Sequence, residues 1–474
     1  MATWEPIADL ARKVQSGELK ALELVERSLS AIAEAESFQA IIATTTERAR
    51  ERAAAIDARV AAGESVGRLA GVPFIAKDNY LVFGAETTAA SNILRGFDAP
   101  YQSVVIEKLE AEGAICVAKA NLDAFAHGAS TENSDFFTTL NPHDKTRVPG
   151  GSSGGSAASV VLGMAPFALG TDTGGSTRQP ASFVGCVGYK PTYGLMSRSG
   201  IVAMASSLDT VGTFAATVAD AALVADVMAG KDELDSTTID REAEGYVVSA
   251  ADLKGKKVGV IKEYMGEGLS DNVRTQVEKA IQALTEAGAE VQEISLPSAP
   301  LGLAVYYILC PAEVSSNLSR YDGQRYGLST PDAANLSDSY TEARERGFGK
   351  EAKRRIMIGT YVLSSGYYDA YYRKAQTVRT KLINEFDEAF KSVDFLVGPV
   401  APTTAFKIGE NASNPLAMYL ADVMTVPASL AGVPAISVPC GTSDGLPVGL
   451  QIMAPQRADR ALLAMAAAAE GLVI

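Results

Sequence analysis

The stretch GTDTGGSTRQP, residues 170–180, places Ser176 directly behind two glycines and ahead of an arginine. Glycines allow a backbone to turn sharply and to bring its N–H groups close to a bound atom. The apolar stretch APFALGTD, which runs into this turn, predicts a buried strand. A serine in such a turn is a candidate nucleophile, but its hydroxyl stays weak until a neighbouring base takes its proton. A base for Ser176 must therefore come from elsewhere in the chain.

The base for Ser176 has three candidates. The only two histidines, His127 and His143, lie in no recognisable triad motif, so a surface or structural role is the commoner interpretation of each. Lysine acts as a base when burial lowers its pKa and leaves the amine neutral. Lys77 ends the apolar stretch GVPFIA, where a strand would carry it to the edge of a sheet. A solvent-exposed lysine leaving a strand is the ordinary alternative for Lys77.

A second glycine-serine loop, GGSSGGSA, contains Ser152 and opens the helical run SAASVVLGMA. Loops of this kind before a helix often bind phosphate, so a nucleotide site is one interpretation. However, the chain has no GxxxxGK[ST] and no GxGxxG motif, which weakens that interpretation. A flexible linker is also disfavoured, because the flanking segments are apolar.

Lys77, the GGSSGGS loop and the DTGGSTR loop, in this order, resemble the amidase signature family, as does the spacing of 24 residues between Ser152 and Ser176. The resemblance implies that Ser176 is the acyl nucleophile, that Ser152 is a bridging serine on a cis peptide bond and that Lys77 is the base. It also implies an oxyanion site made of four backbone N–H groups, those of Thr173, Gly174, Gly175 and Ser176.

The resemblance is strongest to one branch of this family, the A subunits of bacterial tRNA-dependent amidotransferases. It extends from about residue 5 to about residue 455 and includes KDN, STENS, SSLDTVG and GLPVGLQIMAP. Glutamine carries an α-carboxylate and an α-ammonium group, and the resemblance assigns Arg355 and Asp422 to them. Tyr306 and Gly128 are implied as further residues of the substrate pocket. The chain departs from the branch at Ala124, usually glutamate, and at His127, usually methionine.

The resemblance further implies an activity and partners. This chain would hydrolyse glutamine without a cofactor or metal of its own. The ammonia would pass to a B subunit, which uses ATP and Mg and binds the aminoacyl-tRNA, and a C subunit would complete a heterotrimer. Whether Gln-tRNA, Asn-tRNA or both are made stays open. A stand-alone amidase of small aliphatic or aryl amides is one alternative, and a non-catalytic nucleotide-binding module is the other.

Alternating helix and strand patterns predict one large α/β domain over residues 1–474, with a mixed central sheet covered by helices on both faces. The catalytic core is expected at about 70–215 and a substrate-specificity helical region at about 300–390. A split into two domains near residue 250 is less economical. Near the start, an apolar stripe predicts an amphipathic helix; it consists of Leu22, Val25, Leu29 and Ile32.

The composition excludes several functions. With 42 basic and 56 acidic residues the formal charge is −14, which argues against broad phosphate-driven RNA binding by this chain alone. The four cysteines form no CxxC pair and are expected to be buried, reduced thiols; they are Cys116, Cys186, Cys310 and Cys440. No signal peptide and no apolar run of ~20 residues is found, so we expect a cytoplasmic protein without membrane contact.

Overall fold

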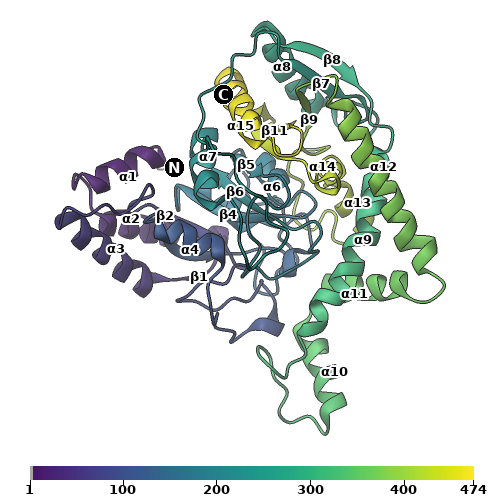
Figure 1. Ribbon diagram of the computed structural model, residues 1–474. Helices are drawn as coiled ribbons and strands as arrows, with labels where there is room; N and C mark the ends of the chain where they lie inside the picture. The colour runs from purple at the N-terminus through teal and green to yellow at the C-terminus, as the bar shows by residue number, and fades with distance from the viewer. Residues whose placement is uncertain (1–3, 474) are drawn as a thin grey trace.

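The computed structural model of the protein describes residues 4–473, which contain one sheet of eleven strands in the order β1-β3-β2-β4-β6-β5-β10-β11-β9-β7-β8 (Figure 1). The strands are β1 Ile41–Thr44, β2 Pro73–Lys77, β3 Ile115–Ala120, β4 Phe167–Asp172, β5 Val187–Lys190, β6 Thr210–Ala215, β7 Lys257–Ile261, β8 Glu290–Ile294, β9 Phe395–Pro399, β10 Ala435–Ser443 and β11 Leu446–Met453. Strand β2 runs parallel to β3 and β4, and β7 to β8 and β9, while β4, β5, β6, β10 and β11 pair antiparallel. The predicted mixed sheet is confirmed.

Strands from both sides of residue 250 belong to this sheet, because β5, which precedes that residue, pairs with β10, which follows it. The sheet is therefore continuous across the position where a two-domain split was the less favoured alternative. The inner strands β2, β3, β4 and β6 are buried at every position, so they show no alternation of apolar and polar residues.

Helices cover both faces of the sheet. They are α1 Ile7–Gln15, α2 Ala21–Glu34, α3 Thr46–Ala61, α4 Val104–Ala111, α5 Gly154–Val161, α6 Arg178–Val184, α7 Val218–Met228, α8 Asp271–Glu286, α9 Gly302–Asn317, α10 Leu336–Gly347, α11 Lys350–Leu363, α12 Lys374–Ala389, α13 Pro415–Leu420, α14 Val426–Ala431 and α15 Asp459–Val473. Helices α4, α7, α15 and α8 form one layer in which neighbours touch, and α5 and α6 form another. Among residues 4–473, no helix is long and apolar enough to cross a membrane.

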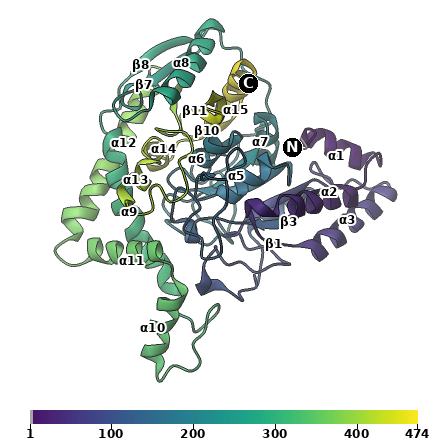
Figure 2. The ribbon, with the colours of Figure 1, turned by 180° about the vertical axis from the view of Figure 1, so that it is seen from behind.

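The first helices and the later helices lie at opposite ends of the molecule. Helices α1 to α3 lie on the side of the molecule that holds β1, β3 and β2, and α2 and α3 touch β3 (Figures 1 and 2). Helices α9, α11 and α12 lie on the other side, and α10 extends away from the body in both views. The predicted helix near the start of the chain is α2, but part of its stripe is wrong. Leu22 is exposed, and the face that α2 buries contains Leu24, Val25 and Ile32.

Candidate active site

The carboxyl ends of two neighbouring parallel strands bring the predicted catalytic residues together. Strands β2 and β4 pair in register from Phe74 opposite Phe167 to Ala76 opposite Leu169. Lys77 is the last residue of β2, and the loop with Ser176 follows directly after β4. The carboxyl ends of adjacent parallel strands are a common place for active sites in α/β sheets. The GGSSGGS loop enters the same place because it precedes α5, which packs on β4.

The amine of Lys77 is wholly buried and lies among three hydroxyl groups. Its Nζ is 2.7 Å from Ser152 Oγ, 2.8 Å from Ser153 Oγ and 2.9 Å from Thr171 Oγ1. Burial lowers the pKa of Lys77 to about 7, although the charges of nearby aspartates oppose this shift. A lysine with this pKa is neutral in a large fraction of molecules near pH 7, so its lone pair can accept a proton.

Ser152 follows a cis peptide bond, Gly151–Ser152. The segment is fixed from two sides: the N–H of Gly151 donates to Gln179 Oε1 at 2.9 Å, and the N–H of Asp123 donates to the Ser152 carbonyl at 3.2 Å. The buried carboxylate of Asp123 in turn accepts the N–H groups of Thr131 and, more weakly, of its neighbours. The Ser152 hydroxyl is thereby held beside Lys77.

Ser176 lies in the loop between β4 and α6, and its hydroxyl has no hydrogen-bond partner within residues 4–473, Ser152 included. The backbone N–H groups of residues 173–176 also donate no hydrogen bond within that part of the chain. The loop is held by Asp172, which accepts the N–H of Thr177 and forms a wholly buried ion pair of 2.8 Å with Arg178. The geometry therefore leaves a hydroxyl and several backbone donors available to a bound molecule.

Two glycines of this loop let other side chains approach it. A Cβ atom on Gly174 would lie 2.8 Å from the ring of Tyr306, and one on Gly175 would lie 2.1 Å from Thr425 Oγ1 and 3.2 Å from Asp422 Oδ1. Gly175 also has φ 150°, which side chains rarely adopt. Tyr306 and Asp422, predicted as substrate residues, thus pack directly against the loop that carries Ser176.

Asp422 is buried, and its Oδ1 has no hydrogen-bond partner within the described chain. Burial, together with the charge of Asp172, raises its pKa well above the usual value, while Arg355 opposes the shift. An unpaired buried carboxylate is costly in the folded protein. Asp422 therefore brings an unpaired polar atom to the loop that carries Ser176.

Arg355 lies in α11 with its guanidinium buried. Its Nε donates to Glu351 Oε1 at 2.9 Å, and it stacks over the rings of Tyr307 and Tyr419 at 5.1 and 5.8 Å. Its two terminal nitrogens have only distant partners, the Cys310 sulfur at 3.9 Å and the Tyr307 hydroxyl at 3.5 Å. The structure thus brings Arg355 into the electrostatic surroundings of Asp422 with much of its donor capacity unused.

The remaining predicted residues lie nearby or are structural. A Cβ atom on Gly128 would lie 2.3 Å from the carboxyl carbon of Asp123, so Gly128 packs on that side chain. His143 is hydrogen-bonded to the Val184 carbonyl at 2.8 Å, and within residues 4–473 neither histidine is bonded to Ser152 or Ser176. The alternative of a histidine base therefore has no geometric support. All four cysteines are buried and unpaired, as expected.

Several residues of the site were missed by the sequence analysis. Ser153 and Thr171 bind Lys77, Asp123 supports the cis peptide, and the Asp172–Arg178 ion pair fixes the nucleophile loop. Asp172 and Arg178 stand within the quoted stretch GTDTGGSTRQP. Asp172 ends β4 and Arg178 begins α6. Two opposite charges on either side of a glycine turn, next to the apolar run APFALG, are a signal that could have indicated a buried pair.

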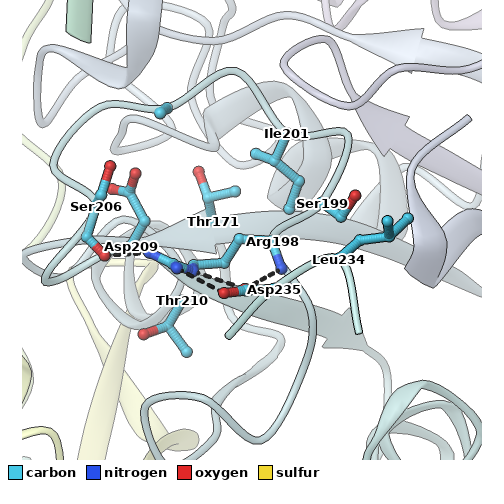
Figure 3. A pocket seen from close by; sticks show the side chains of 10 residues that line it. Thr171, Arg198, Ser199, Ile201, Ser206, Asp209, Thr210, Leu234 and Asp235 are labelled. Atoms are coloured by element: carbon cyan, nitrogen blue, oxygen red, sulfur yellow. Dashed lines mark hydrogen bonds and ion pairs between the residues drawn. The ribbon is translucent and has the colours of Figure 1, made fainter. Parts of the chain in front are cut away.

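A small polar cavity of about 180 Å³ adjoins the site on the Thr171 side (Figure 3). Thr171 and Asp209 line it, and Asp209 accepts a hydrogen bond of 2.7 Å from the hydroxyl of Thr173. The ion pair of Arg198 with Asp235, 2.7 Å long, closes another part of its wall. None of the predicted substrate residues lines this cavity.

The fold and the site define a class of protein. A model of the Amidase family matches residues 23–463, so the chain belongs to the amidase family. Among curated proteins, it is 54% identical to the glutamyl-tRNA(Gln) amidotransferase A subunit from Synechococcus sp. (strain JA-2-3B'a(2-13)), over 94% of this chain and 88% of the relative.

Solved structures of related proteins have the same fold as this chain. The glutamyl-tRNA(Gln) amidotransferase A subunit from Thermotoga maritima is 40% identical, with a TM-score of 0.80, over 97% of this chain and 93% of that one. The peptide amidase of Stenotrophomonas maltophilia is 30% identical, with a TM-score of 0.83, over 99% and 96% of the two chains. Because the fold is shared with a peptide amidase, it does not by itself distinguish between these activities.

Proposed function

We propose that this chain is the glutaminase subunit of a tRNA-dependent amidotransferase. The observation that carries the proposal is the 54% identity, over 94% of the chain, to the A subunit of a glutamyl-tRNA(Gln) amidotransferase. Membership of the amidase family supports hydrolysis of an amide by an acyl-enzyme route. The product that matters to the complex is then ammonia, released from the side chain of glutamine.

In the proposed reaction, Ser176 Oγ attacks the side-chain amide carbon of glutamine. Its proton passes to Ser152 Oγ as the Ser152 proton passes to neutral Lys77, and the negative charge that forms on the amide oxygen is stabilised by the N–H groups of residues 173–176. The relay returns a proton to the leaving nitrogen, and water then hydrolyses the glutamyl ester. The 2.7 Å contact between Lys77 and Ser152 supports this route, which also requires Ser176 to contact Ser152.

The substrate pocket in this proposal contains two opposite charges. Arg355 would bind the α-carboxylate of glutamine and Asp422 its α-ammonium group, while Tyr306 and Gly128 would shape the space between them. The unused donors of Arg355 and the unpaired oxygen of Asp422 support this assignment. We further propose that the relay occupies a catalytic core at about 70–215 and that recognition depends on the helical region at about 300–390.

The proposal places the ATP chemistry and most of the tRNA contacts on partner subunits. A B subunit would hold ATP and Mg and most of the aminoacyl-tRNA contacts, and a C subunit would complete a cytoplasmic heterotrimer. The naming of the relatives as A subunits supports a multi-subunit assembly. The net charge of −14 supports a tRNA contact made mainly by another chain.

The test measures glutamine turnover by the chain alone and with its co-purified subunits, ATP and charged tRNA. We expect turnover to rise in the complete mixture and amidated tRNA to form, because the ammonia is then consumed. If the chain alone hydrolyses simple amides rapidly, and the added subunits neither bind it nor change its rate, then it is a stand-alone amidase and the proposal is wrong.

A further inference from the structure

His127 is a buried imidazole without a partner. His127 directly follows the short helix η3, Ala124–Ala126, and its side chain is fully buried. Neither ring nitrogen has a hydrogen-bond partner within residues 4–473. The backbone around it is fixed, because its N–H donates to the Ala124 carbonyl at 3.0 Å and its own carbonyl accepts from Asn133 Nδ2 at 2.9 Å. The other histidine, His143, has a ring partner in the Val184 carbonyl. Two unpaired nitrogens on one buried ring are unusual, because buried polar groups are normally paired.

The charged surroundings of His127 indicate what would satisfy it. Burial and the positive charge of Arg355 keep its pKa well below the usual value, so the ring is neutral and offers one N–H donor and one acceptor. The same Arg355 charge acts on Asp422, whose Oδ1 is also unpaired. Geometry also links His127 to Arg355: Ala124 and Asn133, which bond the His127 backbone, line one cavity with Glu351, the ion-pair partner of Arg355. His127, Arg355 and Asp422 are thus three buried groups with unused polar atoms.

A molecule that satisfies all three groups must carry both charges. Arg355 pairs with Glu351 through Nε, and its two terminal nitrogens have only distant partners. An anionic group beside these nitrogens is favoured and a cationic one is repelled, so the group that meets His127 is a negatively charged acceptor. A neutral imidazole then donates its N–H to a carboxylate oxygen, in a charge-assisted hydrogen bond. A methionine at this position would offer no donor of this kind.

We propose that His127 is a specificity-determining residue whose ring N–H donates to the α-carboxylate of glutamine beside Arg355. This inference rests on the proposed function, because it takes glutamine as the substrate. It adds a second donor to the carboxylate end of the pocket and leaves the α-ammonium group to Asp422.

The kinetic test compares three amides on the chain with its co-purified subunits: glutamine, glutaramate, which lacks the α-ammonium group, and γ-aminobutyramide, which lacks the α-carboxylate. In His127→Met, we expect the KM for glutamine and glutaramate to rise about tenfold to a hundredfold, since the bond lost is to a charged group. The KM for γ-aminobutyramide should stay within about twofold, a margin well below the loss of one hydrogen bond. His127→Gln keeps an N–H donor and should recover part of the loss, and His143→Met is the matched control.

The inference is overturned if His127→Met changes the KM of all three amides equally, or of none. If His127→Met does not fold, the contact can still be measured by NMR on the His127 ring of a chain that keeps this histidine. Because the chain has two histidines, isotope-labelled histidine gives two imidazole signals, and His143→Gln assigns them. In the Ser176→Ala background, glutamine and glutaramate should shift the His127 signal and γ-aminobutyramide should not; no shift with either carboxylate overturns the inference.

Failure of the proposed function would look different. In that case the wild-type protein would hydrolyse simple amides but not glutamine, with or without its subunits. The comparison of glutaramate with butyramide would then still decide the role of His127, because only glutaramate carries a carboxylate. A larger effect of His127→Met on glutaramate supports the inference, and equal effects overturn it.

Discussion

The Nζ of Lys77 lies 2.7 Å from Ser152 Oγ, and both side chains are fully buried. Since water does not reach either group, the proton that Lys77 gains or loses is exchanged with neighbouring hydroxyls. Ser153 and Thr171 occupy the other directions around the amine, so its lone pair has few acceptable orientations. This arrangement makes the protonation state of one lysine decisive for the proposed reaction.

The rate should fall on the acid side of neutrality. Burial lowers the pKa of Lys77 to about 7, so below that pH the amine is protonated and cannot accept the relay proton. We expect kcat/KM for glutamine to decrease about tenfold for each pH unit below about 7. The measurement is a pH–rate profile over the range in which circular dichroism shows a folded protein.

The titration of Asp123 must be distinguished from that of Lys77 in this profile, because burial raises the pKa of Asp123 to about 6. Asp123→Asn should keep the acid limb but move it to lower pH, because the charge of Asp123 raises the pKa of Lys77. A profile that stays flat down to the pH of unfolding, or a limb that disappears in Asp123→Asn, contradicts the assignment of Lys77 as the base.

Removal of any member of the proposed relay should abolish most activity. We expect Ser176→Ala, Ser152→Ala and Lys77→Ala each to lower kcat by several orders of magnitude, roughly 10³-fold or more, because the groups act as one unit. Ser156→Ala is the matched control: this serine, in the first turn of α5, is equally buried but bonds the Leu169 carbonyl. Near-wild-type hydrolysis by folded Lys77→Ala would exclude the lysine relay.

Arg355→Ala should act selectively on substrates with a carboxylate. The change removes a buried cation, and truncating one partner of a buried charge pair costs about 2–5 kcal/mol, or roughly 30-fold to several thousandfold in kcat/KM for glutamine. Butyramide, which has no α-groups, should be affected little. Arg354→Ala is the control, since Arg354 is its neighbour in α11 and also pairs with Glu351 but is half exposed. Equal losses with glutamine and butyramide would identify Arg355 as a structural residue.

Asp422→Asn should make the empty protein more stable and less active. The pKa of Asp422 is raised well above its usual value, so the folded state favours the protonated form, and the charged form reduces stability increasingly as the pH rises. At pH 7, we expect the free energy of unfolding to increase by about 1–3 kcal/mol and kcat/KM for glutamine to fall. The measurement is urea unfolding together with glutamine kinetics.

Asp172→Asn is the contrasting control for that experiment. Its carboxylate is also fully buried but is paired with Arg178, so its loss leaves an unpaired cation and should lower the free energy of unfolding by about 3–5 kcal/mol. If Asp422→Asn destabilises the protein in the same way, then Asp422 has a structural partner and its assignment to the substrate is wrong.

The sequence predicted the parts of the fold in which the pattern of residues is local. Strands β2 and β4 were expected from the apolar runs GVPFIA and APFALGTD, and helix α5 from the run SAASVVLGMA. Strands β1 and β5 were missed because four residues are too few for a periodic pattern. Strands β6 and β11 were also missed; like β2 and β4, they are buried along their whole length and show no alternation of apolar and polar residues.

Site residues could be predicted from the sequence only where they belong to a short motif of neighbouring residues. The glycine-serine loops indicated Ser152 and Ser176, and the family resemblance indicated Lys77, Arg355 and Asp422. Pairing across the chain has no local signal, so the contacts of Asp123 with the cis peptide and of Thr425 with the Gly174 carbonyl could not be foreseen. The unpaired ring of His127 also becomes visible only once its surroundings are known.

The residues of the proposed site come from two separate stretches of the chain, and this has an evolutionary consequence. Residues 77–176 contain the proposed relay beside the sheet, while the proposed recognition residues Tyr306, Arg355 and Asp422 come from helices and turns beyond residue 300. Mutations in the later stretch can therefore retarget the enzyme to another amide while the bond-breaking apparatus is inherited unchanged. An ancestral hydrolase with this arrangement could change its substrate by changes in the later stretch alone. The same stretch is therefore the part of the chain to redesign when a new substrate preference is wanted.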